Sequence, residues 1–296
     1  MKVRAQAPAS SANLGPGFDV LALALDLWLD AEAREAHPTR VIWTGTGSGE
    51  VQLDDNNLIV RAAQEPFNGW ARPLRGLELQ VRNAIPIGRG LGSSAAAIIA
   101  GIGLGSRLRA MRLSAERMLQ LALGMEGHGD NLAAALYGGF CVAILDGTRC
   151  RVHRLAWPSR WKAVIFVPDK QSPTQELRTL LPDEAARSDA VFNMGRVAEW
   201  VLAVRNRDGR LLRGAMEDRL HQPARASAYT YLQPMIRAAL EAGALGAALS
   251  GAGGGVIAIV DRSPARVAAA FGLEAQRQAV RGSVLRLRAV GGRRFR

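Results

Sequence analysis

A glycine-rich segment in the first half of the chain has the composition of a phosphate-binding loop. Its glycines let the backbone approach a phosphate closely, and the start of the following helix adds about half a positive charge. It lacks the Gly-Lys-Ser/Thr of a Walker A loop. A plain strand–turn–helix junction would explain a single Gly-x-Gly, whereas the whole run predicts phosphate binding. The predicted contacts are Pro86, Gly88, Arg89, Gly90, Leu91, Gly92, Ser93, Ser94 and Ala95.

A polar turn near the N-terminus is a candidate substrate site. Asn13 and Asp19 flank the rigid run Gly15-Pro16-Gly17. An aspartate can accept hydrogen bonds from an ammonium group, and an asparagine can bind a hydroxyl or a carboxylate. An Asx-rich surface turn would have the same composition. The phosphate loop elsewhere in the chain favours the substrate interpretation.

A third polar segment, residues 126–131, follows a predicted helix and reads Glu-Gly-His-Gly-Asp-Asn. Magnesium takes one or two protein oxygens together with substrate phosphates, so Glu126 is a candidate magnesium ligand. The hydroxyls of Ser93 and Ser94 could bind the same ion or the phosphates. His128 could contact a substrate or could cap the preceding helix.

These segments resemble motifs of the kinase superfamily named for galactokinase, homoserine kinase, mevalonate kinase and phosphomevalonate kinase, the GHMP kinases. The glycine loop resembles the nucleotide-binding signature. The N-terminal run 8–19 looks like the motif of the homoserine kinases in particular, and residues 250–255 resemble the C-terminal glycine loop. The resemblance implies ATP and Mg²⁺, a homoserine acceptor, a magnesium site of Ser93, Ser94 and Glu126, and substrate contacts from Gly251 and Gly253.

The resemblance also implies the remaining site residues. Asn131 stands where other superfamily members have a catalytic aspartate; Asp130 is an alternative base, or a helix cap. Thr174 would lie near the transferred phosphoryl group, and Arg178 and Arg225 would grip the homoserine carboxylate, because arginine forks bind carboxylates bidentately. Without the motif match, any one arginine of this chain would count as a surface charge.

The elements that must position these residues are those of an α+β protein, with long helices between non-adjacent strands. Helices are predicted at 93–108, 114–125, 184–204, 211–220, 231–242 and 264–271. Strands are predicted at 3–7, 20–29, 140–145, 161–168, 247–250, 256–260 and 283–290, with a turn at 10–19. The resemblance implies a ribosomal protein S5 domain 2-like lobe at 1–155 and a ferredoxin-like lobe at 156–296.

The composition of the chain limits the kinds of binding partner that we expect. The 296 residues carry a net charge of +12, almost all of it arginine and scattered along the chain. The sequence therefore favours a small-molecule enzyme over a nucleic-acid-binding protein. No run of about 18 apolar residues predicts a membrane span, and no signal peptide is recognisable at the N-terminus. We expect a cytoplasmic protein, with Cys141 and Cys150 reduced on neighbouring strands. A homodimer is expected only from the family.

Two other functions remain open at this point. The first is a GHMP kinase acting on a different alcohol, such as a mevalonate-type compound or a sugar. The second is a basic RNA-binding protein, since an S5-like lobe also occurs in translation factors.

Overall fold

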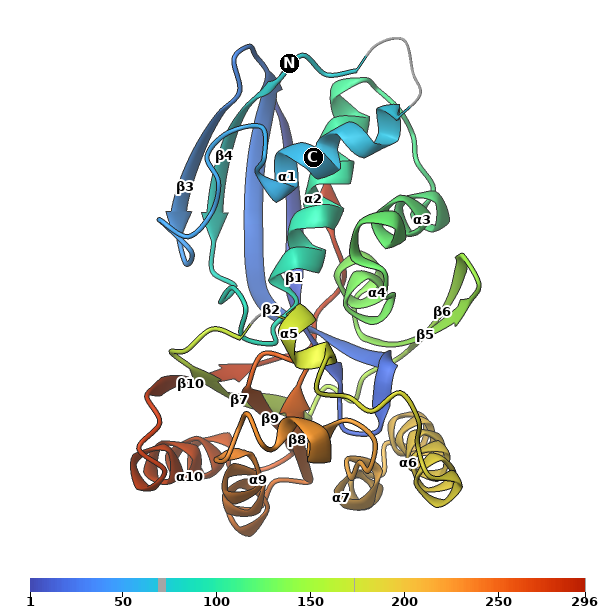
Figure 1. Cartoon of the computed structure of the whole chain (residues 1–296), viewed down its shortest axis with the longest axis vertical. Coiled ribbons are helices and arrows are strands. Elements are labelled where there is room, and N and C mark those ends of the chain that lie inside the picture. The colour runs from blue at the N-terminus through green and yellow to red at the C-terminus, as the bar shows by residue number, and fades with distance from the viewer. Residues whose placement is uncertain (69–72, 173, 296) are drawn as a thin grey trace.

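Two β-sheets, one in each lobe, form the frame of the molecule (Figure 1). The computed structural model describes residues 1–68, 73–172 and 174–295, without the side chains of Thr174 and Gln175. The lobes are stacked along the long axis, and the long strand β2 reaches from one to the other (Figure 1). This arrangement confirms the predicted α+β class.

The sheet of the first lobe has the order β11-β1-β2-β4-β3, and β5 and β6 extend it from the early part of β2. The strands β3 and β4 are parallel, with α1 between them in the chain, and the other pairs are antiparallel. The bounds are β1 Val3–Asn13, β2 Gly17–Glu35, β3 Arg40–Gly45, β4 Leu77–Asn83, β5 Phe140–Asp146, β6 Arg149–Leu155 and β11 Arg294–Phe295.

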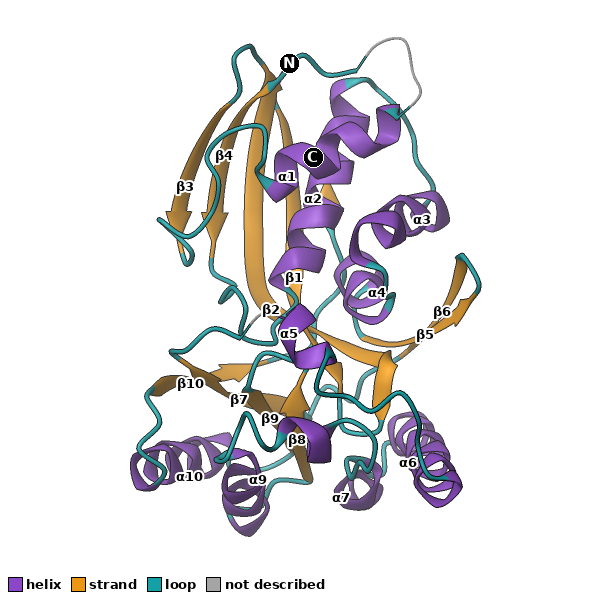
Figure 2. Ribbon diagram, viewed as in Figure 1, coloured by secondary structure: helices purple, strands orange, loops and turns teal. Residues whose placement is uncertain are grey.

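Four α-helices cover one face of this sheet (Figure 2). They are α1 Leu58–Gln64, α2 Ser93–Leu108, α3 Ala115–Glu126 and α4 Asp130–Tyr137. A short 3₁₀ turn, Glu65–Phe67, follows α1. Helix α2 is buried from Ala95 to Ser106, which explains its run of alanine, isoleucine and glycine: small side chains let it pack between the sheet and its neighbouring helices.

The second lobe has a four-stranded antiparallel sheet of order β10-β7-β9-β8. Its strands are β7 Lys162–Pro168, β8 Gly246–Ser250, β9 Gly255–Val260 and β10 Gly282–Leu287. Its helices are α5 Thr174–Arg178, α6 Arg187–Asn206, α7 Leu212–Ala215, α8 Gln222–Arg225, α9 Leu232–Glu241 and α10 Pro264–Arg277, with a 3₁₀ turn at Gly209–Leu211. The chain order and the strand order are those of a ferredoxin-like fold, as expected.

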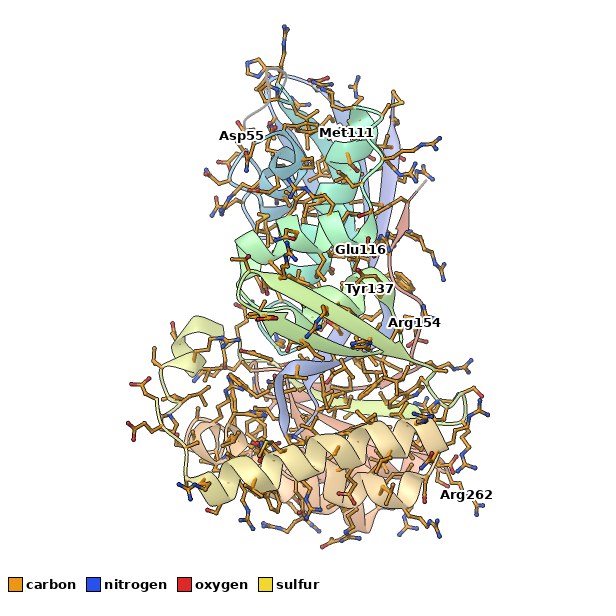
Figure 3. All side chains as sticks on the ribbon, turned by 90° about the vertical axis from the view of Figure 1, so that its right-hand side faces the viewer. Asp55, Met111, Glu116, Tyr137, Arg154 and Arg262 are labelled. Carbon is orange, nitrogen blue, oxygen red and sulfur yellow. The ribbon has the colours of Figure 1, made fainter. Side chains whose placement is uncertain are left out.

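The two lobes share one hydrophobic core. Trp200 of α6 stacks on Phe140 of β5 with ring centroids 5.3 Å apart, and Trp157 packs beside both. The indole N–H of Trp200 donates a 2.9 Å hydrogen bond to the carbonyl of Leu14, at the turn between β1 and β2. Figure 3 shows α6 lying lengthwise across the second lobe, below the β5–β6 hairpin that carries Arg154. The lobes therefore form one packed body.

Several predicted elements differ from the structure. The predicted turn at 10–19 shrinks, because β1 continues to Asn13 and β2 starts at Gly17. The predicted helix at 211–220 is only α7, and α1, β6 and β11 were not predicted. The last of these, β11, pairs with β1, so the end of the chain returns to the first lobe. Apart from β11, the division of the chain into two lobes near residue 155 remains a prediction.

Candidate active site

The predicted phosphate loop lies between β4 and the N-terminus of α2, at the junction of the lobes. Gly88, Gly90 and Gly92 have φ values of 68°, 76° and 66°, a region that favours glycine. Gly92 is the N-cap of α2, and no side chain caps the helix. Among the described residues, no group accepts a hydrogen bond from the N–H groups of residues 88–94. Amides at the start of a long helix therefore remain free to bind an anion.

The turn between β8 and β9 packs directly on this loop. A Cβ atom at Gly90 would lie 1.9 Å from the carbonyl oxygen of Ser250, and one at Gly253 would lie 2.2 Å from the nitrogen of Gly90. The hydroxyl of Ser250 is 2.7 Å from the carbonyl oxygen of Gly90. Gly251, expected at the substrate site, lines the cavity in front of the loop. Gly90 and Gly253 thus bring the β8–β9 turn into backbone contact with the phosphate loop.

The Arg89 side chain turns away from the loop's free amides. Its guanidinium donates hydrogen bonds to the carbonyls of Ile87 (2.8 Å), Pro168 (2.9 Å) and Asp169 (2.6 Å). Two of these carbonyls, those of Pro168 and Asp169, lie at the end of β7 and directly after it. Arg89 therefore fastens the phosphate loop to the second lobe, and its part in phosphate binding falls to its backbone N–H. Pro86 lies in the turn before the loop, and Leu91 and Ala95 are buried.

An acidic cluster with one histidine faces the start of α2. His128 Nδ1 lies 3.2 Å from Asp130 Oδ1, and its Nε2 lies 3.8 Å from Glu126 Oε1. Burial lowers the pKa of His128, but the hydrogen bond to Asp130 and the two negative charges raise that pKa by more. Burial also raises the pKa of Glu126. The polar atoms of Asp19, His128 and Asp130 lie within 4.8 Å of one another.

The same cluster offers oxygen donors for a magnesium ion. Glu126 and the hydroxyl-bearing Ser93 and Ser94 line one cavity. The Glu126 side chain is only 16% exposed. It accepts no hydrogen bond from the described residues, and His128, 3.8 Å away, is the cation nearest to it in the ion pairs of the described residues. A hard cation that prefers oxygen ligands suits this donor set.

Asn131, at the start of α4, is held by the first strand. Its Oδ1 accepts a 2.7 Å hydrogen bond from the hydroxyl of Ser10 in β1. The neighbouring Asp130 is 2% exposed, and its Oδ1 accepts hydrogen bonds from the backbone N–H of Asn131 (2.7 Å) and from His128. Asp130, the first residue of α4 after the N-cap Gly129, therefore binds a backbone amide of the first turn as well as lining the site. Asn131 keeps its amide nitrogen for a ligand.

Two arginines and an aspartate close the opposite side of the cavity. Arg178 of α5 donates to both carboxylate oxygens of Asp19, at 3.0 Å and 2.6 Å. Arg225 is 1% exposed, and its Nη1 lies 3.0 Å from His221 Nδ1. Burial, and then the charge of Arg178, lower the pKa of Arg225. The ring of Phe18 contacts both guanidinium groups, at 5.3 Å and 5.4 Å.

Asn13, the last residue of β1, holds the start of β2, which carries Asp19. Its amide nitrogen donates to the carbonyl of Gly251 (3.0 Å), and its Oδ1 accepts from the backbone N–H of Asp19 (3.1 Å). Asn13 lines the cavity as well, but these two hydrogen bonds give it a structural task that links the two lobes. The left-handed backbone of Asn13 and Asp19, with φ of 67° and 57°, explains why short polar residues occupy both positions.

A second, apolar cavity of about 210 Å³ opens beside the phosphate loop. It lies between β3, α1 and α2, with Trp43 and Leu58 on its walls and Ser93 and Ser94 at the edge that it shares with the first cavity. Asn57 caps α1 at its border. An apolar slot of this size next to free phosphate-binding amides suits a heteroaromatic ring.

Known proteins resemble this chain in sequence and in fold. Two family models match the chain, the GHMP kinases N terminal domain over residues 57–139 and the GHMP kinases C terminal model over 201–275. A homoserine kinase from Caldicellulosiruptor bescii is 40% identical to this chain, with 88% of the chain and 85% of the relative covered. The chain belongs to the homoserine kinase family of the GHMP kinases.

Other homoserine kinases agree with this assignment. The relative from Thermus thermophilus is 42% identical, with 84% of each chain covered. The crystal structure of homoserine kinase from Cytophaga hutchinsonii superposes with a TM-score of 0.88 at 27% identity, over 100% of this chain and 97% of that one. A Leishmania major mevalonate kinase structure, at 16% identity and a TM-score of 0.72, shares the fold.

For this homoserine kinase family member, the sequence analysis predicted no functional role for Ser10 or Phe18 and did not predict the cavity beside Trp43. Ser10 lies in the predicted turn, and Trp43 reads as an ordinary core residue, so neither carries a local signal. Thr174 begins α5, but its side chain lies outside what the structure describes. Cys141 and Cys150 are free thiols on the paired strands β5 and β6, as expected. Among the described helices, none has the length and hydropathy needed to cross a bilayer.

Proposed function

We propose that this chain transfers the γ-phosphoryl group of ATP to the side-chain hydroxyl of L-homoserine, giving O-phospho-L-homoserine for threonine biosynthesis. One observation carries the proposal: free loop amides and a pair of arginines with an aspartate line the same cavity. A polyphosphate complements the free loop amides. An acceptor with an ammonium and a carboxylate complements the two arginines and the aspartate.

In this proposal, the chain holds the nucleotide in two places. The amides of residues 88–94 and the N-terminus of α2 bind the phosphates, and the apolar cavity beside Trp43 receives the base. Glu126, Ser93 and Ser94 hold the magnesium ion. When bound, Mg²⁺ neutralises charge that develops on the β- and γ-phosphates.

The acceptor is positioned between the lobes. Asp19 binds its ammonium, and Arg178 and Arg225 bind its carboxylate. The Asn131 amide, oriented by Ser10, points its nitrogen at the hydroxyl or at the transferred group. Phosphoryl transfer through a loose transition state depends mainly on alignment and charge neutralisation, so an asparagine in place of a basic side chain suffices. Thr174 remains a proposed contact of the phosphoryl group.

A panel of acceptors in an ADP-release assay, with and without Mg²⁺, tests this function. L-homoserine should give magnesium-dependent turnover, whereas mevalonate, galactose and L-serine should give little. Preferred turnover of mevalonate or galactose would move the chain to another GHMP kinase activity. Salt-dependent retention of RNA without any ATP turnover would favour the RNA-binding alternative.

We also propose a cytoplasmic location, expected from the sequence, and a homodimeric state, expected from the family. Size-exclusion chromatography with light scattering measures the mass directly. A 31.7 kDa species at micromolar concentration would contradict the dimer.

A further inference from the structure

A further cavity, of about 410 Å³, lies where the chain passes between the lobes. One wall comes from residues 156–161, which connect β6 to β7, and another from residues 288–291, which lead from β10 back toward β11. Figure 3 shows Arg154, a lining residue on β6, at the level where the lobes meet. Among the described residues, none lines both this cavity and the one in front of the phosphate loop. The cavity is therefore separate from the candidate active site.

The lining of this cavity is positively charged. Among the residues that the structure describes, three cations and no carboxylate line it: Arg154 of β6, Lys162 of β7, and Arg288, which directly follows β10. None of the three forms an ion pair with a described residue, whereas Arg34 on the first-lobe sheet is paired with Glu78. Uncompensated positive charge gathered around one cavity favours an anionic ligand.

The N–H donors of these cations are only partly used. Arg154 Nη1 donates a 3.2 Å hydrogen bond to the last carbonyl of α4, and the Lys162 ammonium donates one of 2.6 Å to the carbonyl of Ser159. The guanidinium of Arg288 donates to no described residue; its backbone N–H donates to Oδ1 of Asp26, at 2.6 Å. Because a guanidinium and an ammonium each carry several donors, most of them remain available to the oxygen atoms of a ligand.

Two tryptophans give the same cavity an apolar wall. The rings of Trp157 and Trp161 have centroids 5.3 Å apart and meet at 81°. Trp157 is fixed by Phe140, whose ring centroid is 6.1 Å away, and its indole N–H donates to the carbonyl of Trp161 (3.2 Å). Trp161 is 1% exposed, and its own indole N–H finds no acceptor among the described residues. A buried donor in this state lacks an acceptor that the described chain does not supply.

We propose that this cavity binds a small organic anion. Arg154, Lys162 and Arg288 bind its carboxylate or phosphate group, and its apolar part lies against Trp157 and Trp161. The volume of about 410 Å³ suits a metabolite-sized molecule rather than a single inorganic ion. Because the ligand contacts both connections between the lobes, its binding holds the lobes together and stabilises the folded state.

Four probes separate the charge from the apolar part. Cyclohexanecarboxylate carries both, whereas acetate lacks the apolar part and cyclohexanemethanol lacks the charge. Cyclohexyl phosphate places the same apolar part on a phosphate, so a comparison of the two cyclohexyl anions shows which anionic group the cavity prefers. Saturating L-homoserine and MgADP are present in every titration, so that the probes do not enter the candidate active site.

Tryptophan fluorescence measures binding, because two tryptophans line the cavity. The wild type should bind at least one of the cyclohexyl anions with a dissociation constant of about 1 mM, and acetate and cyclohexanemethanol at least about 10-fold more weakly. The thermal midpoint should rise over the same concentration range of the bound anion. The absence of a saturable signal with both cyclohexyl anions up to about 20 mM would overturn the proposal, and so would equal affinity for acetate.

A double variant, Arg154→Gln with Arg288→Gln, tests the location of the site. Both side chains are exposed, so the fold should tolerate the changes, and thermal melting checks this. The matched control is Arg151→Gln with Arg286→Gln, which removes the same charge from β6 and β10 at residues that do not line the cavity.

The first double variant should weaken binding of the cyclohexyl anion at least about 10-fold, and the control should change it less than about 2-fold. Equal weakening in both double variants, or an unchanged affinity in the first, would refute the site. The comparison of the two variants does not depend on the kinase activity, so a failure of the proposed function would leave this test intact.

Discussion

The hydroxyl of Ser10 donates a 2.7 Å hydrogen bond to Oδ1 of Asn131, which joins the first strand to the start of α4 across 121 residues. The backbone N–H of Ser10 also donates to the carbonyl of Leu91, 3.0 Å away in the phosphate loop. One residue thus fixes the position of the loop and the orientation of a neighbouring amide. The carbonyl side of that amide is taken, so its nitrogen faces the cavity.

Ser10→Ala should therefore lower kcat about 10-fold and leave the KM for homoserine almost unchanged. The amide of Asn131 loses the hydrogen bond that decides which of its ends faces the substrate. Steady-state kinetics measure both constants, and Ser227→Ala, at an exposed hydroxyl, is the control. A change in KM alone would contradict the orienting role.

Gly92→Ala should abolish most of the activity, by at least about 100-fold, and destabilise the protein by about 1–3 kcal/mol. The residue has φ of 66°, and a Cβ atom there would lie 2.1 Å from the hydroxyl of Ser10 and 2.9 Å from Oδ1 of Asn131. Turnover and urea unfolding measure the two effects.

Gly124→Ala is the matched control for that variant. Gly124 lies inside α3 with open space around its Cβ position, so alanine should raise the free energy of unfolding by about 0.5–1 kcal/mol without affecting turnover. Equal behaviour of the two variants would show that the crowding at Gly92 has no consequence.

Arg225→Ala should raise the KM for homoserine about 100-fold and change kcat little, because in the proposed function the arginine binds the carboxylate and not the transferred group. Arg225 is fully buried and contacts His221, so thermal melting of the variant must show that it is folded. Arg225→Met, which retains the volume, should give the same kinetics. An unchanged KM in both variants would remove Arg225 from the substrate site.

Glu126→Ala should lower kcat about 100-fold or more and raise the magnesium concentration needed for half-maximal activity. The partly buried carboxylate accepts no hydrogen bond from the described residues, so a structural role does not explain it. A magnesium titration at saturating ATP and homoserine measures the effect. Wild-type magnesium dependence in this variant would place the ion elsewhere.

Glu35→Gln should lower the free energy of unfolding at neutral pH by about 1 kcal/mol or less, since the ion pair between Glu35 and Arg109 is partly exposed. Hydrogen bonds from Arg109 lower the pKa of Glu35 from 4.5 to about 2. A lowered pKa means that the stabilisation is present above pH 4.5 and disappears as the pH falls toward 2. Urea unfolding of both proteins between pH 7 and pH 3 measures the difference. A difference that is constant with pH would contradict the ion pair's role.

The sequence predicted best those elements whose burial is uniform. Helix α2 matches its predicted range, and strand β7 does so to within one residue, because both have a long, continuously buried stretch; α2 begins after Gly92 and β7 ends at Pro168. The predicted turn at 10–19 was too long because the hydroxyls of Ser10 and Ser11 find distant partners, Asn131 and Ser250, which let the strand stay buried. Strand β11 is two residues long and carries no pattern.

For the site, too, local features were predicted and contacts between distant residues were not. Local motifs predicted the glycine loop, the 126–131 cluster and both arginines, and the structure brings them to one cavity. The direction of each side chain depends on partners far away in the sequence. Arg89 turns to the carbonyls at the end of β7, Asn13 joins the two lobes, and Arg178 binds Asp19; residue spacing predicts none of these contacts.

The close backbone contact between Gly90 and Gly253 connects the phosphate loop of the first lobe directly to the second lobe. A hinge that swung the lobes apart would pull on the loop itself. Nucleotide occupancy and lobe orientation are therefore coupled through a few atoms. A bound triphosphate should slow amide hydrogen exchange in the β8–β9 turn, even though that turn belongs to the other half of the molecule.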